Sequence, residues 1–277
     1  MATALQQAGY EVAQHDPAPH LDEALVKTAD VVFSVLHGKH GEDGEMQAQL
    51  DTLGVPYVGS GEAASRLCFD KWQYKQLLIK NNLLTPQGAL LHDENLQQHP
   101  LAQKPFVLKP YDGGSSVDTF IVRDPATADF TTMQRALEQH GRMLLEALIE
   151  GTEITVGVLG TSALPVIEII PPSGAEFDYE NKYNGQTQEL CPPPHVSDEL
   201  QKQAQALALQ IHTLCGCRHY SRTDIMITPE GKLQVLETNT LPGMTDQSLI
   251  PKAAAAEGIT MVQLVDRLVK LAQQSVA

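Results

Sequence analysis

The chain has 277 residues, with 19 Lys and Arg against 34 Asp and Glu, which gives a formal net charge of −15. The length favours about two domains. The acidic balance argues against a nucleic-acid or anionic membrane partner, because both require a basic surface. The chain also lacks an apolar run of the roughly 18 residues that a membrane span needs, and its N-terminus has no basic and then apolar leader. We therefore expect a soluble, cytoplasmic protein.

The four cysteines indicate neither a disulfide framework nor a zinc site. None of them belongs to a C-x-x-C pair, and no second Cys/His pair at ligand spacing accompanies Cys215 and Cys217. A chain of this length also needs no disulfide staples. We expect reduced, buried thiols at Cys68, Cys191, Cys215 and Cys217.

The first third of the chain alternates helix and strand signals. Residues 3–9 are typical of the end of a helix closed by a glycine. The apolar, β-branched residues 31–36 predict a buried parallel strand that runs into a loop. Between residues 60 and 82 we predict two short helices, which begin after the polar residues Ser60 and Asp70.

The rest of the chain begins with a stretch that favours antiparallel strands, at residues 106–111, 120–123, 143–149, 153–160 and 164–170. Residues 171–194 contain five prolines and no sustained period, which indicates a lid or a linker. A helix is predicted over residues 200–214, and a hairpin with strands 224–228 and 233–239 follows. The chain closes with an amphipathic helix. The pattern predicts an α/β beginning followed by two α+β parts.

Three oxygen-bearing side chains are predicted to converge at one end of the hairpin. Asp224 opens the first strand, and Glu237 and Asn239, which share a face because they are two residues apart, close the second. Hard oxygen ligands of this kind suit Mg²⁺ that bridges substrate phosphates. Ordinary polar residues at strand ends are the alternative, but Glu237 next to an apolar run would be costly to bury unpaired.

Two glycine-rich segments are candidate ligand loops. In residues 109–117 a lysine on an apolar strand precedes a Gly/Ser-rich turn, whose N–H groups and hydroxyls can wrap a phosphate. Residues 37–44 place three glycines at the carboxyl end of a parallel strand, where open α/β sheets bind ligands. An ordinary hairpin turn and a solvated turn are the respective alternatives. The absence of a G-x-S-x-G elbow argues against nucleophilic hydrolysis.

Eight segments carry a more specific signal, and they span residues 31 to about 270. They are HGKHGEDG at 37–44, GVPYVGSG at 54–61, DKWQYK at 70–75, VLKPYDGGSSV at 107–117, EGTEITVGVLG at 150–160, DYENKY at 178–183, SRTDIM at 221–226 and LETNTLPGMTDQSLIPKAA at 236–254. In this order they resemble the D-alanine–D-alanine ligases of the ATP-grasp superfamily.

The resemblance implies an ATP-grasp fold with an incomplete N-terminal Rossmann-like domain. Residues 1–60 would form the N-terminal substrate domain and residues 61–148 the central ATP-grasp domain. Residues 149–277 would form the C-terminal ATP-grasp domain, with residues 171–194 as its lid. A homodimer through the first domain is also implied.

The implied reaction joins two D-alanines with ATP, for peptidoglycan precursors of the cell wall. The first D-alanine's carboxylate takes the γ-phosphoryl group, and the second's amine attacks the acyl phosphate. A D-alanine–D-lactate ligase and a catalytically impaired ATP-binding relative are the alternatives. Tyr183 beside Lys182 resembles the peptide-forming branch, which favours D-alanine as the second substrate.

The family's residue roles transfer by motif. For ATP these residues are Lys71 and Lys109 at the phosphates, Lys182 at the γ-phosphate, Glu146 and Glu153 at the adenine amino group and the ribose hydroxyls, and Ser116. Two Mg²⁺ or Mn²⁺ ions would be bound by Asp224, Glu237 and Asn239. The remaining roles are Arg222 at the tetrahedral intermediate, Ser115 and Tyr183 in locking the lid, His37 and Glu42 at the first substrate, and Gly243, Ser248 and Leu249 at the second.

The chain departs from the family pattern in three places. The family's opening strand and its G-G-x-S-x-E turn, whose glutamate binds the first substrate's ammonium, have no counterpart here. We expect either an N-terminally truncated sequence or compensation by another chain. Asp118 replaces a glycine and should weaken ATP binding, and Leu241 replaces a serine.

Overall fold

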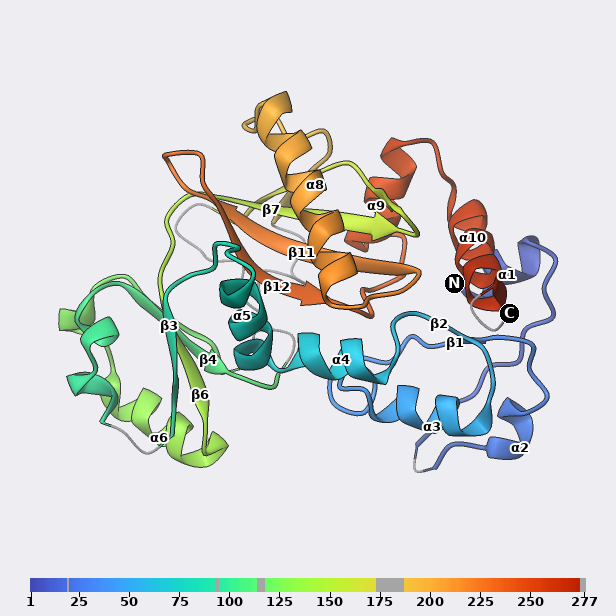
Figure 1. Cartoon of the computed structure of the whole chain (residues 1–277), viewed down its shortest axis with the longest axis horizontal. Helices are drawn as coiled ribbons and strands as arrows, with labels where there is room; N and C mark the ends of the chain where they lie inside the picture. Colours follow the sequence, from blue (N-terminus) through green and yellow to red (C-terminus); the bar gives the residue numbers. More distant parts are fainter. Residues whose placement is uncertain (19, 93–94, 114–117, 173–186, 275–277) are drawn as a thin grey trace.

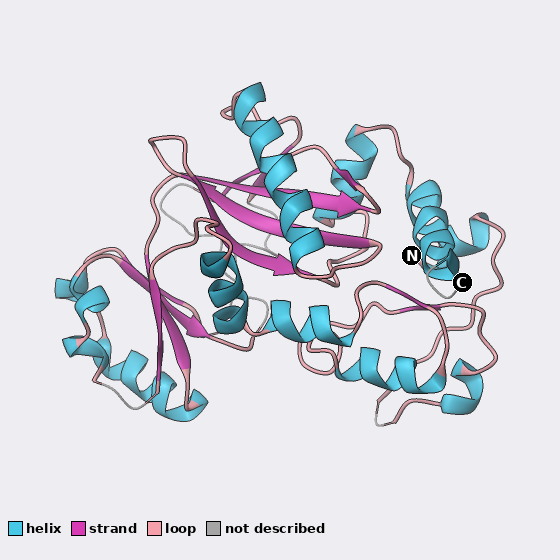
Figure 2. Ribbon diagram, in the orientation of Figure 1, coloured by secondary structure: helices cyan, strands magenta, loops and turns pink. Residues whose placement is uncertain are grey.

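The computed structural model describes residues 1–18, 20–92, 95–113, 118–172 and 187–274. In this part of the chain the strands form three sheets, and helices pack on each of them (Figure 1 and Figure 2). None of the described helices is both long enough and apolar enough to cross a membrane.

The first sheet is small and parallel. Its elements are β1 (Val32–Phe33), α3 (Glu45–Leu53), β2 (Tyr57–Val58) and the short helix α2 (Glu23–Val26). Apolar side chains of α2, α3 and β2 form one core cluster, centred on Leu50. The first helix, α1 (Ala2–Gln7), packs instead on α10 (Met261–Gln274), so the two ends of the chain lie side by side (Figure 1).

The second sheet is antiparallel and has the order β3-β6-β4-β5. Its elements are β3 (Gly88–Leu91), β4 (Phe106–Pro110), β5 (Phe120–Val122), α6 (Phe130–His140), β6 (Met143–Ala147) and the 3₁₀ turns Leu96–Gln98, Pro100–Gln103 and Pro125–Thr127. Side chains alternate along β4, so Phe106 and Leu108 pack in the core with Leu137 of α6. Val107 and Lys109 consequently point to the opposite face.

The third sheet has the order β10-β9-β7-β11-β12, with β8 beside β7. Its elements are β7 (Thr152–Leu159), β8 (Ser162–Ala163), β9 (Ile167–Ile170), β10 (Gln188–Leu190), α8 (Asp198–Leu214), β11 (Tyr220–Ile227), β12 (Leu233–Asn239) and α9 (Leu249–Ala256). Ile154 and Val156 pack with Ala204 and Ala208 of α8 on one face. The other face of β7 packs closely on α9 at Gly157, where a Cβ would lie 2.6 Å from Ile250 Cδ1.

Two consecutive helices, α4 (Glu62–Phe69) and α5 (Lys71–Lys80), follow the first sheet. Asp70 ends the first helix and caps the second, since its carboxylate accepts hydrogen bonds from the backbone N–H groups of Trp72 and Gln73 at 3.1 and 2.9 Å. Helix α5 lies between the second and third sheets (Figure 1). This position brings its lysines to the place where the two sheets approach each other.

The predicted helices at 60–82 and 200–214, the antiparallel strands and the C-terminal helix are confirmed. Three details were wrong. The first strand of the hairpin begins at Tyr220 rather than at Asp224, because it pairs with β7 along its whole length. Strand β10 lies inside residues 171–194, where no strand was predicted, and pairs with β9. The strand predicted at 31–36 is reduced to Val32–Phe33.

Candidate functional site

Two clefts meet beside α5. The larger has a volume of about 640 Å³ and is lined by β4, β5 and β6 of the second sheet and by β7, β9, β11 and β12 of the third. The smaller, of about 330 Å³, lies among the loop after β1, the end of β12 and the start of α9. Lys71, Gly113 and Glu237 line both clefts. A molecule in one cleft can therefore reach a molecule in the other at these three residues.

The larger cleft has an apolar part and a charged part. Its apolar wall includes Val107, Ile121, Leu148, Ile149, Met226 and Leu236. Its charged wall includes Lys71, Lys109, Glu146, Glu153, Asp224 and Glu237. A slot with this division suits a ligand that has a flat, apolar body at one end and negative charge at the other.

A buried carboxylate between two lysines forms the floor of the larger cleft. Glu146 of β6 lies 2.6 Å from Lys75 Nζ and 2.7 Å from Lys109 Nζ, and its side chain is 4% exposed. Burial alone would raise the pKa of Glu146, but the two ammonium groups outweigh it and the pKa is lowered. The group of Lys75, Lys109 and Glu146 thus carries one net positive charge.

The two lysines of this group are affected differently. Burial lowers the pKa of Lys75 despite its contact with Glu146. Burial also opposes the charge of Lys109, but the carboxylates of Glu146 and Glu237 outweigh it and raise the pKa of Lys109. Lys109 therefore stays charged at the cleft surface. Lys75 is held in place by two hydrogen bonds, which it donates to Thr85 Oγ1 and Pro86 O at 2.7 Å.

Lys71 is the first residue of α5 and is held at the junction of the clefts. Its backbone N–H donates to Tyr111 O at 2.8 Å, and its Nζ donates to Gly113 O. The same Nζ lies 3.4 Å from Glu237 Oε2. Lys71 therefore links the first part of the predicted phosphate loop, at Tyr111 and Gly113, to the acidic end of β12.

The hairpin residues gather on one face of the third sheet, as predicted. Asp224 pairs in register with Glu237, and Arg222 pairs with Asn239. Cross-strand partners and residues two apart share a face, so all four side chains leave the sheet on the same side. The predicted convergence of Asp224, Glu237 and Asn239 is confirmed. Only the position of Asp224 was wrong, because it lies within β11 rather than at the start of the strand.

Arg222 and Asp224 form a two-point ion pair. Arg222 Nε and one terminal nitrogen donate to the two oxygens of Asp224 at 3.0 and 2.9 Å. Burial opposes the charge of Arg222, but Asp224 and then Glu237 outweigh it, so the pKa of Arg222 is raised. Thr155 of β7 also donates to Asp224 Oδ1. These contacts fix the guanidinium at the edge of the smaller cleft.

The oxygen atoms of this face fit a magnesium site. Carboxylate and amide oxygens are the ligands that Mg²⁺ takes in proteins, usually together with phosphate oxygens. The three hydrogen bonds to Asp224 use three of the four lone-pair positions of its carboxylate, and Asn239 Oδ1 accepts one bond, from Leu241 N at 2.8 Å. Each of these residues thus retains acceptor capacity, and Glu237 lines both clefts.

His37 and Glu42 line one side of the smaller cleft. Gly38 N donates to Glu42 Oε1 at 3.1 Å, and His37 Nδ1 lies 3.6 Å from the same oxygen. The nearby carboxylate of Glu42 raises the pKa of His37, although burial opposes this. The pair provides a carboxylate and an imidazole on the wall opposite α9.

The start of α9 forms the other side of the smaller cleft. Ser248 precedes the helix, and its Oγ accepts a hydrogen bond from Thr245 N at 3.0 Å. A Cβ at position 243 would lie 2.8 Å from Ser248 Oγ, so a side chain there would displace the Ser248 hydroxyl. The backbone N–H groups that open a helix have no partner within it and favour a negatively charged group. The N-terminus of α9 can thus receive a carboxylate.

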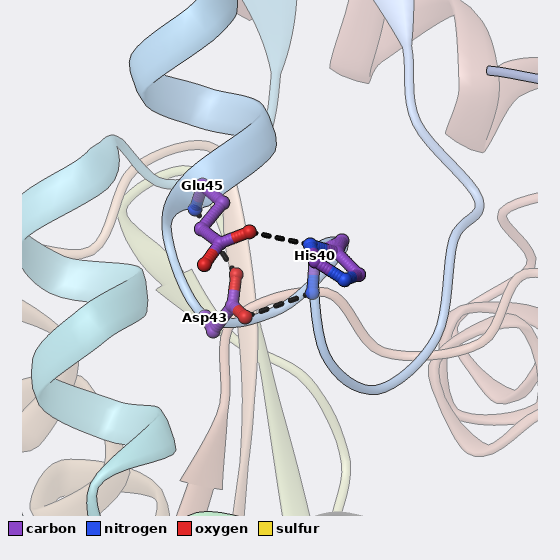
Figure 3. A group of neighbouring side chains, drawn as sticks. All are labelled: His40, Asp43 and Glu45. Atoms are coloured by element: carbon purple, nitrogen blue, oxygen red, sulfur yellow. Dashed lines mark hydrogen bonds and ion pairs between the residues drawn. The ribbon is translucent and has the colours of Figure 1, made fainter. Parts of the chain in front are cut away.

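The loop at residues 37–44 contains a second group of polar side chains, shown in Figure 3. The backbone N–H groups of His40 and Glu45 donate to the two oxygens of Asp43 at 2.8 and 3.0 Å, and the His40 ring contacts Glu45. These bonds hold the turn that leads into α3. The predicted ligand role of the loop therefore concerns His37 and Glu42, which face the cleft.

The other predicted residues are placed as follows. Glu153 of β7 lines the larger cleft. Ser115, Ser116, Lys182 and Tyr183 lie outside the described residues. The exposed Asp118 contacts His140 Nε2 at 2.8 Å, and Leu241 is 3% exposed in the core. The leucine that replaces the family's serine thus contributes to packing.

Lys75 and Glu189 were missed by the sequence analysis. Lys75 follows Lys71 by four residues and therefore shares its helix face, a spacing that could have indicated a second lysine of the site. Glu189 of β10 lines the smaller cleft and lies 2.6 Å from Lys252 Nζ of α9. No sequence signal connects Glu189 with Lys252, because the two residues meet only when β10 and α9 come together in the folded chain.

Comparison with protein families gives two matches that together cover most of the chain. The model described as D-ala D-ala ligase N-terminus matches residues 4–60, and the one described as D-ala D-ala ligase C-terminus matches residues 80–270. A D-alanine–D-alanine ligase of Nitratidesulfovibrio vulgaris is 42% identical over 97% of this chain and 89% of its own length. That of Sphingopyxis alaskensis is 40% identical over 98% of this chain and 90% of its own length.

Solved structures are similar as well. The D-alanine–D-alanine ligase of Bacillus anthracis complexed with ATP has a TM-score of 0.78 and 32% identity, over 91% of this chain and 82% of that chain. The VanG D-Ala:D-Ser ligase of Enterococcus faecalis has a TM-score of 0.76 and 30% identity, over 88% of this chain and 73% of that chain. The similarity thus includes both the sequence and the arrangement of the sheets.

Proposed function

Because the chain belongs to the D-alanine–D-alanine ligase family, with its ATP-grasp fold, we propose that it joins two D-alanines with ATP to supply peptidoglycan precursors. The γ-phosphoryl group passes to the carboxylate of the first D-alanine. The amine of the second then displaces phosphate from this acyl phosphate. The observation that carries the proposal is the meeting of two clefts at Lys71 and Glu237, one suited to a nucleotide and the other to small charged molecules.

ATP occupies the larger cleft. The apolar wall receives the adenine ring, and Glu153 binds the ribose hydroxyls. Glu146 binds the adenine amino group through the carboxylate lone pairs that Lys75 and Lys109 do not occupy. Lys109 and Lys71 contact the phosphates, because both ammonium groups line this cleft and Lys71 lies beside Glu237 of the third sheet.

Asp224, Glu237 and Asn239 would hold two Mg²⁺ or Mn²⁺ ions beside these phosphates. When bound, such ions neutralise charge on the transferring phosphoryl group. The acidic face of the sheet supports this assignment, since Asp224 and Glu237 are cross-strand neighbours that line the nucleotide cleft. Without a cation between them, these carboxylates would repel the triphosphate.

The smaller cleft holds both amino acids. His37 and Glu42 lie at the first D-alanine, and the N-terminus of α9 at Ser248 and Leu249 receives the carboxylate of the second. Arg222 is fixed by Asp224 at the edge of this cleft, so it is in position to stabilise the oxyanion that forms when the amine attacks. In comparable sites one such donor contributes roughly 3 kcal/mol to the transition state.

Four assignments rest on the family resemblance. Ser115 and Tyr183 lock a lid formed by residues 171–194, Lys182 reaches the γ-phosphate, and Ser116 contacts ATP. A closed lid keeps water from the acyl phosphate until the amine attacks. Strand β10, which pairs with β9, fixes the far end of this segment against the third sheet.

We extend the proposal to the whole chain. The three sheets fall within residues 1–60, 61–148 and 149–277, which supports a substrate domain and two ATP-grasp domains with these boundaries. A homodimer follows from the resemblance and is tested by light scattering. Because ATP is supplied in the cytoplasm, we place the reaction there.

The experiment measures phosphate release from ATP with and without D-alanine, and identifies the product by mass spectrometry. We expect release that depends on D-alanine and a product with the mass of D-alanyl-D-alanine. A product formed preferentially with D-lactate or D-serine as second substrate would change the substrate assignment. Binding of ATP without any turnover would instead show an impaired relative.

A further inference from the structure

Three of the four cysteines meet in one hydrophobic cluster of the folded chain. Cys68 lies in α4, Cys215 directly follows α8, and Cys217 precedes β11. All three belong to one hydrophobic cluster, together with Tyr74 and Ile211. The fold thus brings together Cys68 and Cys215, which lie far apart in the sequence.

Solvent reaches the three thiols unequally. Cys68 and Cys215 are each 5% exposed, whereas Cys217 is only partly buried. The backbone N–H of the next residue, Arg218, donates to Ser60 Oγ at 3.2 Å, just before α4. A small reagent from solution therefore meets Cys217 first.

The surroundings also shift the pKa values of the three thiols in different directions: the pKa of Cys217 is lowered, and those of Cys68 and Cys215 are raised. The neighbouring thiols of Cys215 and Cys68 lower the pKa of Cys217 although burial opposes this, and His212 and Ser60 add to the lowering. The neighbouring thiols raise the pKa of Cys68, and burial adds to the rise. The most accessible thiol is thus also the one most readily ionised.

The spacing favours redox chemistry over metal binding. Among the described residues, the group of His, Cys, Asp and Glu ligand atoms that all lie within 4.8 Å of one another is His40, Asp43 and Glu45. The three sulfur atoms do not meet this condition together, and a tetrahedral metal would require it. A disulfide needs only two thiols that can approach each other.

We propose that Cys217 is a peroxide-reactive thiol and that Cys68 is its resolving partner. The Cys217 thiolate attacks one oxygen of hydrogen peroxide, the O–O bond breaks, and the other oxygen leaves as water after protonation. The Cys68 thiol then attacks the sulfur of the Cys217 sulfenic acid and releases a second water. Two thiols are oxidised to one disulfide and one peroxide is reduced to two waters.

The expected consequence for activity rests on the proposed ligase function. Cys68 lines the smaller cleft and lies three residues before Lys71, at the junction of the two clefts. A disulfide would tie the end of α4 to the segment before β11 and move it from its reduced position. Peroxide should therefore lower ligase activity, and a thiol reductant should restore it.

The experiment treats the full chain with hydrogen peroxide, blocks the remaining thiols and digests with trypsin. Trypsin releases Cys68 in residues 67–71, and Cys215 with Cys217 in residues 203–218. We expect these two peptides joined, with a mass two hydrogens below their sum. The joined species should persist in Cys215→Ser and Cys191→Ser and disappear in Cys217→Ser. In Cys68→Ser, the Cys217 sulfenic acid should accumulate and react with dimedone.

Several results would overturn the proposal. They are no joined peptide in the folded wild-type chain, a disulfide within residues 203–218 alone, or joining that survives in Cys217→Ser. Phosphate release is measured in parallel, and Cys217→Ser should keep its activity after peroxide. Joined peptides from a chain that shows no ligase activity when reduced would count against the proposed function and leave the thiol chemistry standing.

Discussion

Glu146 is a carboxylate that stays charged although it is almost completely buried. Its two oxygens contact Lys75 and Lys109, whose cations outweigh the cost of burial. Lys75→Met removes one of these cations, so that Lys109 alone remains to stabilise the buried charge of Glu146. We expect the free energy of unfolding, measured with urea, to fall by about 3 kcal/mol. Lys270→Met is the control, because its exposed pair with Asp266 should contribute no more than about 0.5 kcal/mol. Equal losses in the two variants would contradict the role of burial.

Glu237 lines both clefts, and we expect the reaction to depend on the negative charge of its carboxylate at their junction. Glu237→Ala should lower kcat at least about 100-fold, the loss typical of one missing electrostatic group in such sites. The side chain is part-exposed, so the circular dichroism spectrum and melting temperature should change little. Glu230→Ala, in the exposed turn of the same hairpin, should keep full activity. A Glu237→Ala variant that turns over normally would exclude the two-metal assignment.

At the scale of elements, the packing of β7 against α9 positions the second-substrate site. Gly157→Ala would place a Cβ 2.6 Å from Ile250 Cδ1 and 3.0 Å from Leu164 Cδ1, so the Ile250 side chain must move or α9 must shift with it. We expect a loss of about 1–3 kcal/mol in stability, as for other overpacked cores. The KM for the second D-alanine should rise, since α9 begins at the site. Adding Ile250→Val removes Cδ1 and should restore both quantities in part. If the double variant is no better than Gly157→Ala, the contact with α9 is not the cause.

The same scale shows which elements a sequence can predict. Helix α5 was predictable because its cap, Asp70, and its apolar residues are local signals. Strands β3 and β10 were missed because they are short and exist through pairing with β6 and β9. Helix α9 was missed because it contains Pro251, which is tolerated in a first turn where backbone N–H groups have no helical partner.

The candidate site divides in the same way. The hairpin carboxylates were predicted correctly as neighbours, because residues on adjacent strands have a fixed geometry. The pairing of Lys75 with Glu146 was not predictable, since the two residues are far apart in the sequence and meet only when α5 packs on the second sheet. Motifs therefore predicted which residues line the clefts more reliably than they predicted how those residues neutralise one another.

At the scale of the whole molecule, the larger cleft joins two sheets that have separate cores. A nucleotide bound there contacts both, so it should slow hydrogen exchange in β4 and β6 as well as in β7 and β12. We expect this with a non-hydrolysable ATP analogue and Mg²⁺, and at 100 times its Kd the analogue should add about 2.7 kcal/mol of stability. Residues 23–26 of α2, which line neither cleft, should change least. Lys109→Met should abolish the effect in both sheets together, because one bound molecule causes it. Protection confined to one sheet would mean that the nucleotide binds elsewhere.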